Sequence, residues 1–279
     1  MRTKHILGIV ITYNPDEDLL KDNINAFADH IDEIIIWDNT PNGSLVAKRI
    51  AEDRINSRYI TEEENKGISY VLNKAWHYAA DNGYDFLLTM DQDSIWQDFE
   101  NYLNTTLSRT APEGIYGPEV RTSPVKGETF QLTDYVITSG MLISVKILNL
   151  IKGYKSDFFV DGIDMEMCLR AKSYGIPTFR ISNCHLQQRF GTPQTITICG
   201  LDNHTNNYPS SRIHEILKSH TYILLNYSCS FSLQKKIVLT YFWKVPWKII
   251  LFESDKGQKL KAYCKGIIEG KSVRPTTYN

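Results

Sequence analysis

The sequence has no G-x-G-x-x-G after its first apolar stretch, which argues against a dinucleotide-dependent enzyme on a Rossmann sheet. It has no run of about 20 apolar residues either, so we expect no membrane-spanning helix. Neither charge is in excess, since 31 Lys and Arg stand against 32 Asp and Glu, and no nucleic-acid partner is indicated. The length and composition are those of one large globular α/β domain, or of one domain with an appendage.

Cysteine is also sparse. The five cysteines are scattered, odd in number and without a C-x-x-C, which predicts reduced thiols in a cytoplasmic protein. The first residues and the apolar run at 6–11 loosely imitate a signal peptide. That run is too short and no small-residue cleavage site follows it, so we interpret it as a first strand.

Apolar runs of strand length alternate with amphipathic segments in the first third of the chain. Strands are predicted at 6–12, 34–37, 58–60 and 86–90, and apolar residues at helical spacing predict a helix over 68–79. This alternation is typical of a parallel, doubly wound sheet. After residue 95 the strands follow one another without clear crossover helices, which predicts a mixed sheet.

Two acids follow the strand at 86–90. Asp91 and Asp93 lie where ligands bind in open α/β sheets, beyond the carboxyl end of a strand. Paired carboxylates suit a hard divalent cation that also holds phosphates. A second Asp-x-Asp, at 16–18, lies at a predicted helix start, where the helix dipole alone favours acids.

The last quarter of the chain has a different composition. Residues 191–208 are polar and contain Gly and Pro, which predicts a loop able to fold over a ligand. From Pro209 the composition is helical and aromatic. The segment 235–252 mixes lysines with Ile, Val, Phe and Trp, which indicates either an amphipathic helix on a membrane surface or a packing helix.

Six motifs occur in one order along the chain: Val10–Pro15, Trp37–Asn39, Asn65–Ile68, Leu88–Ser94, Ile137–Gly140 and Asp161–Arg170. In this order the sequence resembles the family-2 inverting glycosyltransferases, and most closely their bacterial rhamnosyltransferase branch. The resemblance implies an α/β, GT-A-type mixed sheet, parallel in its first half and flanked by helices. It implies a glycosyltransferase domain at 1–208, with a nucleotide-binding half to about 95 and an acceptor-binding half at 96–208. A C-terminal helical extension at 209–279 would follow.

The resemblance also implies the site residues. The nucleotide-sugar would be bound by Thr12, Tyr13, Asn14, Asp38, Asn65, Gly67, Asn73, Asp91, Gln92 and Arg212. Asp91 and Asp93 would hold Mg²⁺ or Mn²⁺, and Ser139, Gly140 and Trp96 would lie on the acceptor side. A purely structural role stays open at two of these positions, because Asn14 with the following proline favours a turn and Asp38 could be a helix N-cap.

For the general base the resemblance points to Asp164, with Asp161 as its rival and Glu166 as a residue that orients its neighbours. Many relatives carry a metal-binding His where this chain has Gln188, which predicts weaker metal binding. His185 lies three residues earlier on a strand and would point to the opposite face.

We therefore expect an enzyme that moves L-rhamnose from dTDP-L-rhamnose to a hydroxyl of a growing cell-surface polysaccharide or lipid-linked oligosaccharide, with peripheral contact to the cytoplasmic face of the membrane. A UDP-sugar is the alternative donor. A nucleotide-binding scaffold with little or no turnover is the alternative function, and Gln188 is the residue that suggests it.

Overall fold

The protein is described from a computed structural model, which covers residues 4–120, 128–188, 194–198 and 201–275, with the backbone alone over 194–198 and 201–204. Within these ranges no helix is long and apolar enough to cross a membrane.

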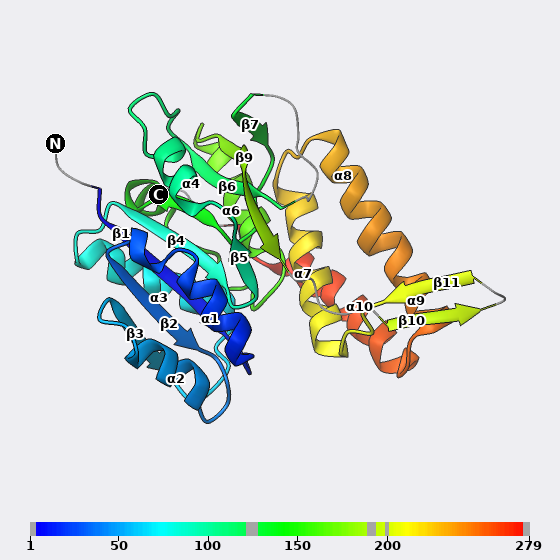
Figure 1. Cartoon of the computed structure of the whole chain (residues 1–279). Coiled ribbons are helices and arrows are strands. Elements are labelled where there is room, and N and C mark those ends of the chain that lie inside the picture. Colours follow the sequence, from blue (N-terminus) through cyan, green and yellow to red (C-terminus); the bar gives the residue numbers. More distant parts are fainter. Residues whose placement is uncertain (1–3, 121–127, 189–193, 199–200, 276–279) are drawn as a thin grey trace.

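One large sheet forms the body of the molecule (Figure 1). Its order is β3-β2-β1-β4-β8-β6-β9-β5, with β7 paired to β9. The strands are β1 (Ile6–Thr12), β2 (Glu33–Asp38), β3 (Ser57–Thr61), β4 (Phe86–Asp91), β5 (Ser94–Trp96), β6 (Ile115–Glu119), β7 (Phe130–Thr133), β8 (Met141–Ser144) and β9 (Thr178–Gln188). The first four are parallel, and β8 runs antiparallel to β4. The predicted mixed sheet with a parallel first half is confirmed.

Helices cover both faces of this sheet. They are α1 (Glu17–Asn25), the short 3₁₀ turn η1 (Ala28–His30), α2 (Leu45–Glu52), α3 (Ile68–Asp81), α4 (Phe99–Thr106), α5 (Val145–Ile151) and α6 (Ile163–Ser173). Along β1, Leu7 and Ile9 belong to one buried cluster while Ile6 and Val10 belong to the other. Successive side chains of a strand point to opposite faces, so the aliphatic run fills two cores at once.

The chain beyond β9 corrects one expectation. The predicted loop at 191–208 contains a hairpin, because β10 (Gln194–Ile198) pairs antiparallel with β11 (Leu201–Thr205). Helices follow it, as the composition predicted: α7 (Ser210–Asn226), α8 (Phe231–Ile237), the π-helical η2 (Val238–Lys244), α9 (Val245–Phe252) and α10 (Lys256–Ser272).

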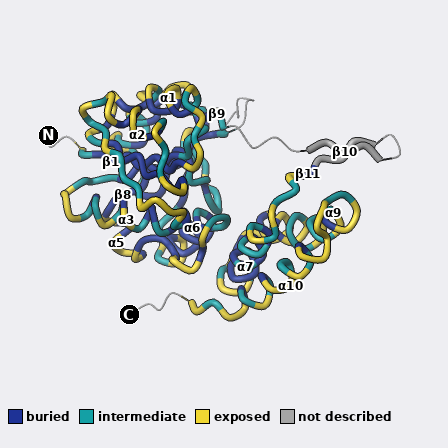
Figure 2. The backbone as a smooth tube through the Cα atoms, turned by 90° about the horizontal axis from the view of Figure 1, so that it is seen from below, coloured by how far each residue is buried: buried dark blue, intermediate teal, exposed yellow. Residues whose placement is uncertain are grey.

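The hydrophobic core does not end at the predicted boundary at residue 208. Tyr222 and Ile223 of α7, with Leu233 and Ile237 of α8, belong to the same buried cluster as the sheet. In Figure 2 the inner side of α7 is buried, whereas α9 carries exposed residues. The division at residue 208 stays a prediction, since apolar packing links the two segments.

A buried ion pair fixes α6. Arg170 and Glu166, one turn apart, are 1% and 0% exposed and lie 3.0 Å apart. Arg170 also donates to the carbonyl of Gly153 at 2.9 Å, and Tyr227 beyond α7 donates its hydroxyl to Glu166 at 2.6 Å. Because the remaining lone pairs and protons are used, the cost of burying both charges is offset. Through these contacts Glu166 holds Arg170 and Tyr227 in place, which is consistent with the expectation that it orients its neighbours.

Candidate active site

The carboxyl ends of β1, β2 and β4 meet at one edge of the sheet, and polar side chains gather there. Thr12 ends β1, Asp38 ends β2 and Asp91 ends β4, with Thr12 opposite Asp38 and Ile11 opposite Asp91 in the strand register. Parallel strands bring residues far apart in sequence to the same edge, which is where ligands bind in such sheets.

Asp38 is fully buried and its carboxylate accepts four hydrogen bonds. Thr12 Oγ1 and the Thr40 amide donate to Oδ1 at 3.1 and 3.0 Å. The Tyr59 hydroxyl and the Ser44 amide donate to Oδ2, at 2.9 and 2.5 Å. These bonds fill the carboxylate's acceptor sites. Asp38 therefore holds the loop after β2 in place, and the base contact expected of it stays a prediction.

Tyr13 and Gln92 join the loops after β1 and β4. The Tyr13 amide donates to Gln92 Oε1 at 2.7 Å, and Gln92 Nε2 donates back to the Tyr13 carbonyl at 3.2 Å. The Tyr13 ring is left exposed. Asn14 adopts a left-handed backbone, φ 46°, and its amide donates to Thr40 Oγ1 at 2.8 Å. The expected nucleotide contacts at 12–14 and 92 thus lie side by side.

The loop at 65–67 packs against a distant segment. Gly67 has φ +80°, and a Cβ there would lie 2.7 Å from the Phe159 carbonyl oxygen. The glycine is needed for this close approach and for the positive φ. Asn65 Oδ1 accepts from the Gly67 amide at 2.9 Å. Asn73, expected on the nucleotide, uses its amide on the Tyr154 backbone at 2.8 and 2.9 Å.

Asp91 lies among acids. Burial, then the charges of Asp93 and Asp164, raise the pKa of Asp91 to about 7. The structure thus brings the acids at the end of β4 close to the acid at the start of α6, although about seventy residues separate them. Like charges in a partly buried site disfavour ionisation, and a cation would relieve that repulsion.

Asp161 precedes α6 and Asp164 lies in its first turn, and the two carboxylates have different partners. Asp161 forms a forked ion pair with Arg212 of α7, with Nε at 3.1 Å and Nη2 at 3.4 Å. The Asp164 carboxylate accepts a hydrogen bond from the Met165 amide at 2.8 Å. Among the described residues it forms no ion pair, unlike Asp161. Burial, and then Asp161, raise the pKa of Asp164 to about 6. A carboxylate of this basicity can accept a proton near neutral pH.

Gln188, at the end of β9, reaches the same acids. The antiparallel pairing of β5 with β9 places it opposite Ser94. Its Nε2 donates to Asp91 Oδ2 at 3.1 Å, and its buried Oε1 has no hydrogen-bond partner among the described residues. The side chain that contacts Asp91 thus carries an orphaned amide oxygen, and together with the two carboxylates it would offer the oxygen donors that Mg²⁺ and Mn²⁺ prefer. The residues present therefore fit a divalent cation, although no cluster of three His, Cys, Asp or Glu suitable for a metal occurs in the part of the chain described.

Residues 9–104 match the family model described as Glycosyl transferase family 2. The chain is a glycosyltransferase, and its match to family 2 covers this N-terminal region. The dTDP-rhamnosyl transferase RfbF of Shigella flexneri is 25% identical to it over 223 residues, which is 71% of this chain and 73% of RfbF.

Solved structures share the fold of this glycosyltransferase. S. aureus TarS 1-349 in complex with UDP-GlcNAc matches with a TM-score of 0.60 and 13% identity, over 94% of this chain and 81% of that chain. GalNAc-T7 with UDP, GalNAc and Mn²⁺ matches with a TM-score of 0.60 and 11% identity, over 97% and 56%. The expected GT-A fold is confirmed, and the family implies a nucleotide-sugar donor.

The predicted acceptor-side residues of the glycosyltransferase are buried. Ser139 Oγ accepts from the Asp91 amide at 3.2 Å, which ties this junction to the acids. Gly140, φ +81°, would place a Cβ 2.7 Å from Pro118 and 2.9 Å from Trp96. Trp96 is 4% exposed and donates to Met90 Sδ at 3.3 Å. The indole belongs to the core, so the structure offers no support for its predicted contact with the acceptor.

Sequence reasoning missed Asn23 and Tyr241. Asn23 in α1 is fully buried and its amide donates to the carbonyl of Asp91 at 2.7 Å, and also to that of Ser94. The sequence does contain a signal for Asn23. Its helical spacing from Leu20 and Ile24 places an amide side chain on the buried face of α1. Tyr241, in the π-helix, packs on His220 with ring centroids 3.8 Å apart. Burial, and then Asp161, raise the pKa of Tyr241, and Asp164 and Tyr135 add to this rise.

Proposed function

We propose that the enzyme transfers L-rhamnose from dTDP-L-rhamnose, with inversion, to a hydroxyl group of a saccharide. The observation that carries the proposal is the convergence of Asp91, Asp93 and Asp164 at one edge of the sheet. The identity to RfbF, which is named a dTDP-rhamnosyl transferase, supports rhamnose as the sugar. A UDP-sugar is the competing donor, since TarS and GalNAc-T7 are shown with UDP-containing ligands.

In this proposal Asp164 takes the proton of the acceptor hydroxyl as its oxygen attacks the anomeric carbon. The new carbon–oxygen bond forms while the bond to the diphosphate breaks, and the departing nucleoside diphosphate keeps the electron pair. Attack and departure on opposite faces give inversion in one step, so no enzyme nucleophile is required. Asp161 is the poorer candidate, because its carboxylate is engaged in the forked ion pair with Arg212.

Asp91, Asp93 and the Gln188 amide oxygen would hold Mg²⁺ or Mn²⁺. When bound, the cation neutralises charge on the diphosphate leaving group. Gln188 supplies an oxygen where relatives carry a His nitrogen, so we expect retained but weakened metal binding. Arg212 is paired with Asp161, so it would bind the diphosphate only if the negative charge of the donor displaced the Asp161 carboxylate from its guanidinium.

The acceptor we propose is a growing cell-surface polysaccharide or lipid-linked oligosaccharide, reached from the cytoplasm. The outer face of α8, η2 and α9 supports contact with a membrane. It exposes Trp243 (63%), Trp247 (50%) and Leu251 (53%). The segment 231–252 contains four lysines and no acid. Aromatic and aliphatic side chains with lysines fit an anionic lipid surface. Residues 209–279 would then be the membrane-facing extension of a 1–208 glycosyltransferase domain.

One experiment tests the function and separates it from a scaffold without turnover. The protein is incubated with dTDP-L-rhamnose or UDP-sugars, Mg²⁺ or Mn²⁺ and saccharide acceptors, and the released nucleoside diphosphate is measured. We expect release that depends on metal and acceptor, with dTDP-L-rhamnose preferred. Donor binding without release in any combination would support the scaffold.

A further inference from the structure

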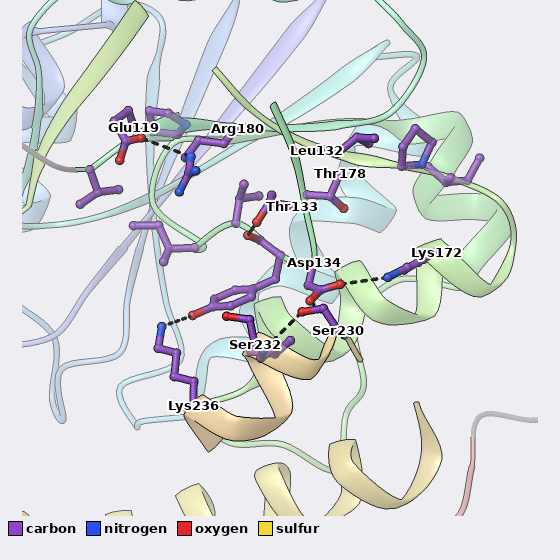
Figure 3. A pocket seen from close by; sticks show the side chains of 18 of the residues that line it. Glu119, Leu132, Thr133, Asp134, Lys172, Thr178, Arg180, Ser230, Ser232 and Lys236 are labelled. Carbon is purple, nitrogen blue, oxygen red and sulfur yellow. Dashed lines mark hydrogen bonds and ion pairs between the residues drawn. The ribbon is translucent and has the colours of Figure 1, made fainter. Parts of the chain in front are cut away.

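A groove with a mixed polar and apolar lining lies between the edge strand β7 and helix α8, with a volume of about 980 Å³ (Figure 3). Strands β6 and β9 and the end of α6 contribute its other residues. None of the predicted donor or metal residues lines it. The groove is therefore distinct from the donor site.

The charges in the groove are largely paired with one another. Lys172 contacts Asp134 at 2.9 Å, and Arg180 contacts Glu119 at 3.2 Å. Figure 3 shows both pairs among the side chains that line the groove, with the Ser230 amide also donating to Asp134 at 3.2 Å. Such a surface has many fixed donors and acceptors but little net charge.

Lys236 is the exception, because it has no carboxylate partner among the described residues. Its Nζ donates to the Tyr135 hydroxyl at 3.0 Å. One such lysine is too little for a phosphate-binding site, which usually collects several cationic or backbone N–H donors. The hydroxyl groups of a sugar both donate and accept, so they fit paired charges and serine hydroxyls. Leu132, which is 74% exposed, adds apolar surface for the carbon face of a sugar ring.

The groove is connected to the catalytic acids. Its wall at Val136 and Ile137 continues into Thr138 and Ser139. The Thr138 backbone hydrogen-bonds to the Asp164 carboxylate, and Ser139 accepts from the Asp91 amide. One backbone segment, 136–139, thus lines the groove at one end and contacts the proposed acids at the other.

We propose that the groove between β7 and α8 binds part of the acceptor saccharide, namely the sugars that precede the one whose hydroxyl receives the transferred sugar. This inference rests on the proposed glycosyltransfer to a saccharide. It makes α8, outside the predicted 1–208 domain, a part of the acceptor site. The enzyme would then require an acceptor of several sugars for tight binding.

The test uses the full-length protein and an array of bacterial polysaccharide fragments from one to six sugars. Ser232→Trp places an indole in the groove from an exposed position on α8, and Lys236→Ala removes its unpaired cation. Lys235→Ala is the matched control, since this neighbouring lysine is exposed and does not line the groove. Thermal melting checks that each variant is folded.

We expect wild type to bind at least one fragment of three or more sugars, and both groove variants to weaken that binding tenfold or more. Lys235→Ala should bind as wild type does. The inference is overturned if wild type binds no fragment, or if Ser232→Trp binds as well as Lys235→Ala. A melting-temperature shift with dTDP-L-rhamnose and Mn²⁺ is recorded on the same samples, so that loss of donor binding, which would refute the proposed function, is seen separately.

Discussion

The carboxyl edge of the sheet and the outer face of the C-terminal helices differ in charge. At the edge, burial and then the charges of Asp93 and Asp164 raise the pKa of Asp91. The segment 231–252 carries four lysines, three of them outside the groove between β7 and α8, with exposed Trp and Leu and no acid. Each region has an excess of charge of one sign, although the net charge of the whole chain is only -1. The difference separates a region that would gain from a bound cation from one that would gain from an anionic surface.

The largest expected effect tests the acidic edge. Replacing Asp164 with Asn should lower transfer by about 10²–10⁴-fold, because the amide cannot accept the acceptor's proton. Steady-state rates measure the loss, and donor binding should persist in a thermal-shift assay. Asp161→Asn is the control, and its loss should be smaller because the Asp161 carboxylate is occupied by Arg212. Near-normal turnover in Asp164→Asn would remove that residue as the base.

Gln188 tests whether the acidic edge holds metal. Gln188→Leu should raise the Mn²⁺ concentration for half-maximal activity by about 10–100-fold, the range seen when residues that support a metal site are lost. Gln188→His should restore or strengthen metal dependence, since imidazole is a good ligand for such ions. An unchanged metal requirement in both variants would place the cation elsewhere.

The acidic edge also predicts a pH dependence. The pKa of Asp164 is raised to about 6, and only the deprotonated form can act as base. When the pH is lowered from 7 to 5, the deprotonated fraction of Asp164, and with it the rate, should therefore fall about tenfold. A rate profile under saturating metal measures this. The residual activity of Asp164→Asn should lack this inflection, and a wild-type profile that stays flat down to pH 5 would contradict the assignment.

The smallest effect tests the basic face. Lys244→Ala should weaken binding to vesicles with anionic lipid by about fivefold, the value of about 1 kcal/mol per lysine near a charged surface. Co-sedimentation measures it. Lys48→Ala, an exposed lysine on α2, is the matched control. Equal binding of wild type to neutral and anionic vesicles would show that the lysines do not face lipid.

The sequence predicted the parallel strands well, because an aliphatic run such as Ile6–Thr12 buried on both faces has few alternatives. The resemblance named Asp91 and Asp164 as site residues, and the structure brings the two near enough to interact. The sequence could not show that Asp38 is saturated by hydrogen bonds, since Tyr59 and Ser44 reach it through tertiary contacts. Trp96 was expected on the acceptor side, and aromatic composition alone does not distinguish a ring that stacks on sugar from one in the core.

The hydrogen bond from Tyr227 to Glu166, 61 residues apart, has a consequence for biosynthesis. When the ribosome has completed α6, the Glu166 carboxylate and the Arg170 guanidinium are paired with each other but lack this final donor. Helix α6, and with it Asp164, can reach its finished environment only after α7 and Tyr227 have been made. A nascent chain that stalls before residue 227 therefore lacks this donor to Glu166, and helix α6 completes its contacts late in translation.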